Sequence, residues 1–466
     1  MKRLPSSHPQ SSRRGSVLIV VLWISLALVA VAISFGSSML MAYRGSDNDL
    51  AGRQAQEAIN GALQYAQTIL INSGTPGVLP DVSTYQSEAV QIGDATFWFI
   101  GRDIYTTPNT DTTPVYGLTD EAAKLNVNTA TAQQLTLLPG MSSDLADSIV
   151  AWRDANGGAD DGSYMAMQPP YISKLAPYES VEELGLVYNL SSLYLYGEDA
   201  NLNGAVDPNE DDGDKNDPLD NSDGQLQPGI LEYLTPFSRE PNTQSSGAAK
   251  INVSTLTDDV IQQIQALNSN VGSKLGPAER TPVQFKSPLE FYSYCVSQKQ
   301  ILPADAAAIY DSVTTTTGPY SFGAVNVNTA QSDVLVALFG DQSIASAIVS
   351  TRQSHVNDGT CTWLVDSKVL TDDQVKTYGP QITGKSYQIS VDIAAVGRNG
   401  RGFRRTLFVL DTSGSASSTS ASASSTSSTG STSTNPTVIY RRNLSHLGWA
   451  LGTVARQNLA QKRNSL

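Results

Sequence analysis

The feature that most constrains this chain is an apolar run near its N-terminus. No charged residue occurs from Ser16 to Tyr43. A helix of that length, at about 1.5 Å per residue, reaches roughly 40 Å, which exceeds the roughly 30 Å hydrocarbon core of a bilayer. Four cations and no acid precede the run: Lys2, Arg3, Arg13 and Arg14. The positive-inside bias therefore predicts a single-pass anchor with a cytoplasmic N-terminus and the bulk of the chain on the other side.

A removed secretory signal peptide and an uncleaved anchor are the two simple readings of such a run. A signal peptide has a shorter apolar core followed by a small-residue cleavage site. Here the run continues without a break into a helical pattern that reaches Leu70 and includes Ala51, Ala55, Ala58 and Ala62. We expect one helix of more than fifty residues, with a stripe of small residues suited to packing against neighbouring helices.

The junction before the run carries a family resemblance. Arg13, Arg14 and Gly15 followed directly by an apolar helix resemble the prepilin-type signal of type IV pilins and type II secretion pseudopilins. In that family a prepilin peptidase cuts after the glycine and the new N-terminus is methylated, which implies cleavage here between Gly15 and Ser16. Two residues depart from the family pattern: Ser16 stands where Phe or Met is usual, and Val20 stands where a glutamate is usual. A carboxylate there would be costly in lipid without a partner, and its absence is typical of the K pseudopilin.

The composition limits the functions open to the chain. The net charge is −14 over 466 residues, which argues against a general nucleic-acid-binding surface, because phosphate contacts need clustered Lys and Arg. It is compatible with calcium. The two cysteines, Cys295 and Cys361, leave two alternatives open: a disulfide in an oxidising periplasm, or two buried free thiols.

Alternating apolar segments predict a small sheet whose strands are far apart in sequence. Residues 95–104 read as a strand, 387–397 and 404–411 as a hairpin across the turn 398–402, and 438–442 as a last strand. The fold class expected is α+β: a pilin-like long N-terminal helix plus a small antiparallel sheet, with a large, mainly α-helical insertion. The resemblance to K pseudopilins implies the same arrangement.

Three related segments fall inside the expected insertion, at 124–130 (KLNVNTA), 250–256 (KINVSTL) and 324–330 (AVNVNTA). In each, Asn or Ser followed by Thr is predicted to cap the next helix. The first and third continue as a helix, a Gly turn and a second helix ending in Arg153 or Arg352, and capped segments with Glu follow at 180–187 and 287–295. The repetition indicates related helical subdomains.

The turn at Leu138, Pro139 and Gly140 resembles a helix-hairpin-helix element, which in other proteins holds DNA phosphates by backbone amides. The alternative is a structural hairpin of the sterile-alpha-motif-like (SAM-like) kind. The turn lacks the second Gly of a phosphate loop and its surroundings are acidic, so we favour the structural hairpin.

These patterns together predict the organisation of the chain. The segments are a prepilin leader at 1–15, a transmembrane and stem helix at 16–75, the first part of a pilin-like domain at 76–118, a first SAM-like domain at 119–245, a second at 246–384, a pilin-like hairpin at 385–411, a flexible Ser/Thr-rich loop at 412–436, and a last strand with a basic tail at 437–466.

The most specific chemical motif is residues 199–210 (DANLNGAVDPNE), which meet the pattern D-x-[DN]-x-[DN]-G-x5-E. In such a loop, side-chain oxygens at positions 1, 3, 5 and 9, a carbonyl at position 7 and a bidentate Glu at position 12 bind calcium. The expected ligands are Asp199, Asn201, Asn203, Ala205, Asp207 and Glu210. Calcium would order a long loop that has no apolar core.

The acidic stretch continues beyond the motif. Asp212, Asp214, Asp217, Asp220 and Asp223 follow within fourteen residues, and so many like charges repel unless cations neutralise them. We expect a second ion there. The simpler alternative for the whole segment is an acidic solvated loop.

No constellation of residues indicates an enzyme. The three histidines, His8, His355 and His446, form no catalytic spacing with Ser or Cys. The resemblance instead implies a minor pseudopilin of the type II secretion system in the inner membrane, with a periplasmic bulk that caps a pseudopilus together with I-type and J-type subunits. The alternatives are a membrane-anchored helix-hairpin-helix DNA-binding protein of a competence system and a minor type IV pilin.

Overall fold

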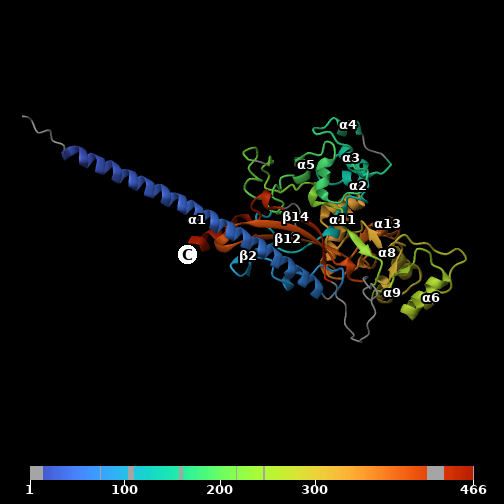
Figure 1. The fold of residues 1–466 in the computed structure, drawn as a ribbon. Coiled ribbons are helices and arrows are strands. Elements are labelled where there is room, and N and C mark those ends of the chain that lie inside the picture. Colours follow the sequence, from blue (N-terminus) through green and yellow to red (C-terminus); the bar gives the residue numbers. More distant parts are fainter. Residues whose placement is uncertain are drawn as a thin grey trace, which may run out of the picture.

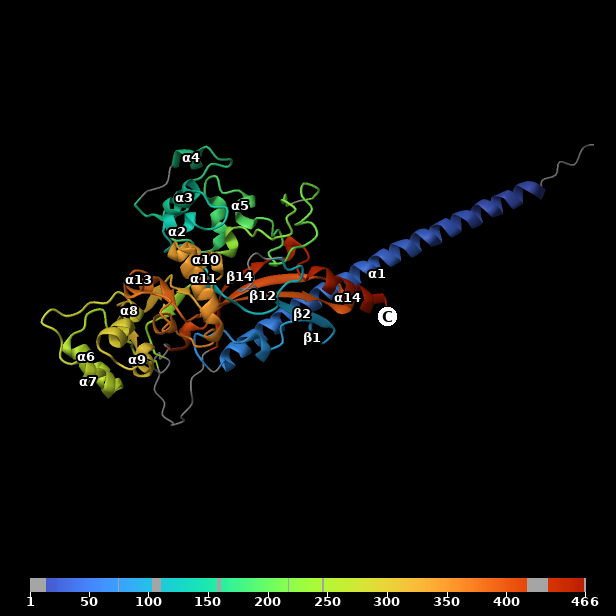
Figure 2. The same ribbon diagram turned by 180° about the vertical axis from the view of Figure 1, so that it is seen from behind.

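The protein is an α+β structure in which one long helix lies on an antiparallel sheet and a large helical insertion interrupts the strands (Figure 1; Figure 2). The computed structural model describes residues 14–73, 75–102, 110–156, 161–216, 218–244, 247–416 and 435–464.

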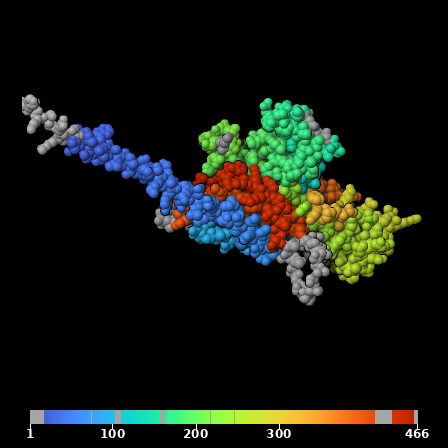
Figure 3. Space-filling view, in the orientation of Figure 1, coloured from blue at the N-terminus to red at the C-terminus, as the bar shows by residue number. Residues whose placement is uncertain are grey.

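The predicted long helix is confirmed as α1, Arg14–Asn72. Side chains from 17 to 46 are all exposed, and burial begins at Ala51. The small residues Ala55, Ala58 and Ala62 are buried against the sheet, which lets the helix backbone lie close to the strands. In the described residues, α1 is the one helix long and apolar enough to cross a membrane, as expected of a pilin-like anchor. Figure 3 shows its first half projecting bare from the body of the molecule.

The sheet has the order β1-β2-β12-β13-β14, with β3 beside β12, and every pairing is antiparallel. Its strands are β1 Val90–Ile92, β2 Ala95–Ile100, β3 Thr119–Asp120, β12 Gln388–Val396, β13 Arg404–Asp411 and β14 Thr437–Asn443. The hairpin and the last strand were thus predicted correctly. The strand predicted for 95–104 ends at Ile100, and 103–109 fall outside the described residues. Phe97, Phe99, Ile393 and Phe408 fill the space between the sheet and α1.

The insertion between β3 and β12 consists of three units, each opened and closed by a two-residue parallel pair of strands. The pairs are β4 Leu125–Asn126 with β5 Leu234–Thr235, β7 Ile251–Asn252 with β8 Val313–Thr314, and β10 Val325–Asn326 with β11 Ile382–Thr383. The three opening strands are the three related segments of the sequence. A short antiparallel pair, β6 Arg239–Pro241 and β9 Tyr320–Phe322, joins the units.

Short helices fill each unit. The first holds α2 Ala132–Thr136, α3 Ser143–Arg153, α4 Asp161–Met165 and α5 Ser192–Tyr196; the second holds α6 Asp258–Leu267, α7 Ser269–Leu275, α8 Pro288–Ser293 and α9 Pro303–Tyr310; the third holds α10 Ser332–Phe339, α11 Gln342–Thr351, α12 Trp363–Asp366 and α13 Asp372–Tyr378. One continuous apolar core runs through all three units.

The two segments predicted to begin with a cap and a Glu differ in structure. Ser287 caps α8 by accepting from the backbone N–H of Glu290 at 3.1 Å, whereas residues 181–186 form a 3-10 turn.

The capping residues predicted at the start of each unit were wrong by two positions. Thr131 and Thr257 cap α2 and α6, while Gln331 precedes α10 without a side-chain cap. The predicted cap Asn128 instead binds another segment, because its Oδ1 accepts from the backbone N–H of Tyr178 at 2.7 Å. Asn126 closes the turn after the strand by accepting from the backbone N–H of Asn128 at 2.8 Å. The turn needs two more residues before helical geometry begins, which moves the cap along the chain.

The two arginines that end the predicted hairpins tie each hairpin to its own strand. Arg153 donates to the carbonyl oxygens of Val127 and Ala130. Arg352, which is fully buried, donates to the equivalent carbonyls of Val327 and Ala330. The repeated sequence pattern is therefore a repeated hydrogen-bonding pattern.

Candidate calcium loop and its surroundings

All six residues expected to bind calcium lie together in one buried loop after α5. Asp199, Asn203, Ala205 and Glu210 are at most 1% exposed. Asp199 begins the loop by accepting from the backbone N–H groups of Asn203 and Gly204, both at 2.9 Å. Gly204 has φ +71, which explains why the sharp turn of the motif needs a glycine.

The acidic groups at the two ends of the loop converge. Asp207 Oδ2 accepts from the amides of Asn201 at 2.6 Å and Asn203 at 2.9 Å. Glu210 folds back over the loop, and its two oxygens accept from the backbone N–H groups of Ala200 and Asp207 at 3.1 and 3.0 Å. The loop therefore has the closed form in which position 12 covers position 1.

Two observations indicate that these residues fit a cation. Asn201 Oδ1 is buried and has no hydrogen-bond partner in the structure. Burial, with Asp199 and Asp207 nearby, raises the pKa of Glu210 to about 8, and burial also raises the pKa of Asp199. A bound dication would neutralise these carboxylates and give the Asn201 oxygen a partner.

The donor set is a mixed one. Within the described ranges, no three His, Cys, Asp or Glu side chains are spaced to hold a metal ion. The candidate site depends on carboxylate, amide and carbonyl oxygens together, which is the set that calcium takes in such loops.

The residues expected to hold a second ion hydrogen-bond within their own loop. Asp220 accepts from the backbone N–H groups of Asp212 and Gly213 at 3.0 and 2.9 Å, and Asp223 accepts from that of Gln225 at 2.9 Å. Asp214 is exposed, and Asp217 lies outside the described residues. The second ion stays a prediction.

Arg405, which is buried, and Arg102, which is half-buried, hold the loop to the sheet, and no sequence pattern indicates either of them. Arg405 on β13 is fully buried; it donates to both oxygens of Asp392 on β12 and to the carbonyls of Asn201 and Leu202. Arg102 donates to the Leu202 carbonyl at 2.9 Å and to Glu232 at 2.8 Å. The loop partners lie about 200 residues from Arg405 and about 100 residues from Arg102 in sequence, so no local pattern could have found them.

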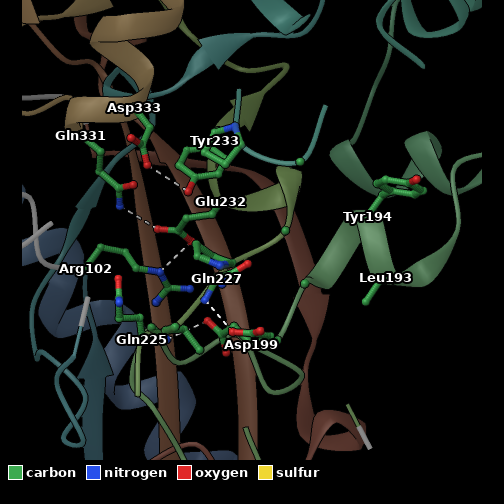
Figure 4. Close-up of a pocket in the computed structure, with 18 of the residues that line it drawn as sticks. Arg102, Leu193, Tyr194, Asp199, Gln225, Gln227, Glu232, Tyr233, Gln331 and Asp333 are labelled. Carbon is green, nitrogen blue, oxygen red and sulfur yellow. Dashed lines mark hydrogen bonds and ion pairs between the residues drawn. The ribbon is translucent and has the colours of Figure 1, made fainter. Parts of the chain in front are cut away.

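An acidic cavity of about 590 Å³ lies between the calcium loop, the first hairpin turn and the third unit. Figure 4 shows Arg102 and Glu232 at its centre, with Gln331 and Asp333 reaching in from the third unit. Pro139 and Gly140 of the helix-hairpin-helix turn line the same cavity, and so do Glu198 and Asp199. Phosphate bound at this turn would face several carboxylates.

The remaining predicted sites lie apart from the loop. Gly15 and Ser16 are in the first turn of α1, and residues 1–13 fall outside the described chain. Cys295 and Cys361 are both buried free thiols in the structure, and Cys361 Sγ lies 3.2 Å from the hydroxyl of Tyr310.

Most of the predicted Ser/Thr-rich loop, 417–434, falls outside the described residues. The basic tail forms α14, Gly452–Asn464, and Trp449 before it accepts from Asn201 Nδ2 at 3.2 Å.

Comparison with known proteins gives two similarities. The helix-hairpin-helix motif family matches residues 120–161, and no curated protein sequence matches the chain. Among solved structures, a chain of the GspK-GspI-GspJ complex from the type 2 secretion system of enterotoxigenic Escherichia coli is similar, with a TM-score of 0.33 and 10% sequence identity, over 89% of this chain and 99% of that one. The protein is thus similar to a component of that pseudopilin complex along most of its length, and to helix-hairpin-helix proteins over its first hairpin.

Proposed function

We propose that this protein is a K-type minor pseudopilin of a type II secretion system, anchored in the inner membrane and placed at the tip of a periplasmic pseudopilus. The observation that carries the proposal is the position of the helical insertion relative to the pilin-like core. It enters between β3 and β12, and its second unit lies at the end of the body opposite to the projecting half of α1, whereas its first unit lies beside the sheet (Figure 3).

The shape supports a terminal place in a fibre. Pilin-like subunits assemble by packing their α1 helices side by side, with each subunit offset along the axis from the next. The second unit, with α6 and α7, extends past the C-terminal end of α1 (Figure 1; Figure 2). It occupies the space that a subunit above would need, whereas the exposed side chains 17–46 are free to pack with subunits below.

The apolar residue Val20 also supports a place at the tip of the pseudopilus. A buried glutamate at this position would need a cationic partner in lipid, such as the N-terminal amine of an adjacent subunit. A subunit at the tip has no subunit above it to provide that amine, so an apolar residue costs nothing there.

Processing tests the first step of this function. Co-expression with a prepilin peptidase should give a mature protein that begins at Ser16 by mass spectrometry. Gly15→Leu should block the cut, whereas Gly36→Leu, at another glycine of α1 whose Cβ would meet open space, should leave it intact. A different first residue would contradict the assignment of the leader.

Assembly tests the tip position. The full chain in detergent should form a stable complex with candidate I-type and J-type pseudopilins in size-exclusion chromatography. Failure to form a complex with either subunit, in a protein that is folded by circular dichroism, would count against a place at the tip.

The matched helix-hairpin-helix motif favours a second candidate, an anchored DNA-binding protein of a competence system. The acidic cavity around Gly140 opposes it. Measurement of duplex DNA binding at low salt separates the two: strong affinity that falls steeply with salt would favour DNA binding. A minor type IV pilin remains a third candidate that shares the anchor.

We propose in addition that the loop 199–210 holds calcium in a structural role. Calcium at 100-fold above its Kd would stabilise the fold by about 2.7 kcal/mol, which corresponds to a Tm increase of about 5 °C or more for a domain of 150–250 residues. Chelation should reverse the increase and expose the loop to protease. Glu210→Gln should abolish the calcium response, and Glu88→Gln, at an exposed acid elsewhere, should keep it. A melt that is identical with calcium and with chelator would refute the proposal.

A further inference from the structure

The C-terminal segment, residues 444–464, lies against the calcium loop, and the functions proposed above give it no role. Asn201 Nδ2 of the loop donates to the backbone carbonyl of Trp449 at 3.2 Å, across 248 positions of sequence. A cavity of about 530 Å³ separates the two segments, with Asp207 and Glu210 on one wall and Trp449 on the other. Figure 3 shows the acidic loop, in green, standing on the red C-terminal part of the chain. These candidate ligands therefore face the C-terminal segment.

The two halves of this segment are held with different strength. Ala450 and Leu451 are at most 1% exposed and pack on the face of the sheet opposite to α1. The helix α14 that follows reaches the same apolar cluster through the half-buried Ala455 and Leu459, and residues 453–460 are otherwise exposed or half-buried. A helix with few buried apolar contacts opens more readily than the core does.

Asn201 is the residue that joins the loop to the segment. Its Nδ2 donates to Asp207 Oδ2 at 2.6 Å and, by a longer bond of 3.2 Å, to the Trp449 carbonyl. Asn201 is only 8% exposed, and its Oδ1 has no hydrogen-bond partner among the described residues. A cation bound to the oxygens of Asn201 and Asp207 would leave the Trp449 carbonyl as the main acceptor for Nδ2. Such a carbonyl orients the ligand that donates to it.

Trp449 transmits this contact to the start of α14. Its Nε1 donates to the carbonyl of Gly452 at 2.7 Å, and the guanidinium of Arg456 lies 5.3 Å from the centre of its ring. The other neighbour of the ring is Phe403 before β13, with ring centres 5.1 Å apart. Arg456 and Gly452 line the same cavity as the candidate ligands. A shift of Trp449 would therefore move the first turn of α14 relative to the loop.

We propose that α14 and the turn before it form a cover over the calcium loop, with Asn201 as its latch. Bound calcium fixes the Asn201 amide, strengthens its hydrogen bond to the Trp449 carbonyl and holds α14 closed over the cavity. Release of the ion then requires the cover to open. This inference rests on the proposed calcium site, but it does not depend on the secretion system to which the protein belongs.

Hydrogen exchange of the full chain in detergent, with excess calcium or with EGTA, tests the cover. Calcium should slow the exchange of residues 449–460 about fivefold, which is the effect of about one hydrogen bond, and should change α6 of the second unit less. The loop 199–210 reports in the same samples whether calcium binds. Slower exchange in the loop with no change in 449–460 would overturn the cover. No change in either segment would instead refute the calcium site itself.

A matched pair of variants tests the latch. Asn201→Asp keeps an oxygen at position 3, where the motif accepts Asp or Asn, but it removes the N–H donor to Trp449. With calcium raised until exchange in the loop no longer changes, residues 449–460 should lose their protection in this variant. Asn209→Asp adds the same charge to the same loop at a position that is not one of the six candidate ligands, and it should keep the protection. Equal protection in the two variants would show that Asn201 is not the latch.

Discussion

Arg405 should be among the most sensitive positions in the protein, although it lies in no recognised motif. Its guanidinium is fully buried between β13 and the calcium loop. Nε and Nη2 donate to the Asp392 carboxylate at 2.9 and 2.6 Å, and the remaining donors hold the carbonyls of Asn201 and Leu202. Arg405→Met keeps the length of the side chain and removes all of these bonds.

The expected loss of stability arises because Arg405→Met would leave the buried Asp392 carboxylate without its ion-pair partner. Asp392 is only 6% exposed, and removal of one partner of a buried ion pair costs about 3–5 kcal/mol, because the other charge stays buried and unpaired. Arg102 is close enough to interact with Asp392, but it already pairs with Glu232 at 2.8 Å. We therefore expect a decrease of about 3–5 kcal/mol in the free energy of unfolding for Arg405→Met.

Denaturant unfolding of the full chain in detergent measures this decrease, and limited proteolysis reports whether residues 199–224 are released from the sheet. The double variant Arg405→Met, Asp392→Asn removes the stranded charge and should recover at least half of the lost stability, while the loop should stay accessible to protease. If the double variant is no more stable than the single one, the unpaired carboxylate is not the source of the loss. A loss below about 1 kcal/mol in the single variant would refute the argument entirely, since it would match an exposed ion pair.

Two further predictions concern single positions. In thermal melts, Gly402→Ala should destabilise the protein by about 2 kcal/mol more than Gly93→Ala. Both glycines have positive φ, but only at Gly402 would the added Cβ clash with the α1 backbone. Equal losses of stability in the two variants would show that this contact is not tight. Burial raises the pKa of Asp120 to about 6, although hydrogen bonds from Ser386 and Thr329 act in the opposite direction. The protonated carboxyl therefore contributes its full stability below the ordinary pKa of 3.8, and this contribution is lost as the pH rises through 6. The stability of the wild type relative to Asp120→Asn should accordingly fall by up to about 3 kcal/mol between pH 4 and pH 7, and a difference that stays constant with pH would contradict the raised pKa.

Local patterns predicted the elements of this protein well where the physical cause is local. The uninterrupted apolar and small-residue periodicity produced α1, and alternation with turn residues produced β12, β13 and β14. The loop 199–210 could be singled out because its six candidate ligands lie within twelve residues. Helix caps were placed less well, because Asn128 and Asn328 bind the backbone of distant residues, Tyr178 and Thr360, rather than the helix that follows.

Contacts between distant segments could not be read from the sequence. The three parallel strand pairs join residues separated by about 60 to 110 positions, and two-residue strands have no pattern of their own. Arg405 and Arg102 look like ordinary surface cations in the sequence, and only the packed fold buries Arg405 and half-buries Arg102. The buried carboxylate of Asp120 likewise depends on Thr329 and Ser386, which come from the far side of the insertion.

The sequence by itself determined the long apolar helix, the main strands, the repeated hairpins and the residues that make up the acidic loop 199–210, because each depends on periodicity or spacing over a few turns of chain. The tertiary structure decided how these parts meet: that the insertion extends beyond the end of α1, that two arginines fasten the acidic loop to the sheet, and that the basic C-terminus returns to the point where the anchor leaves the body. Such contacts depend on burial and on the closure of long loops, whose free energies are set by the whole fold and not by any local pattern.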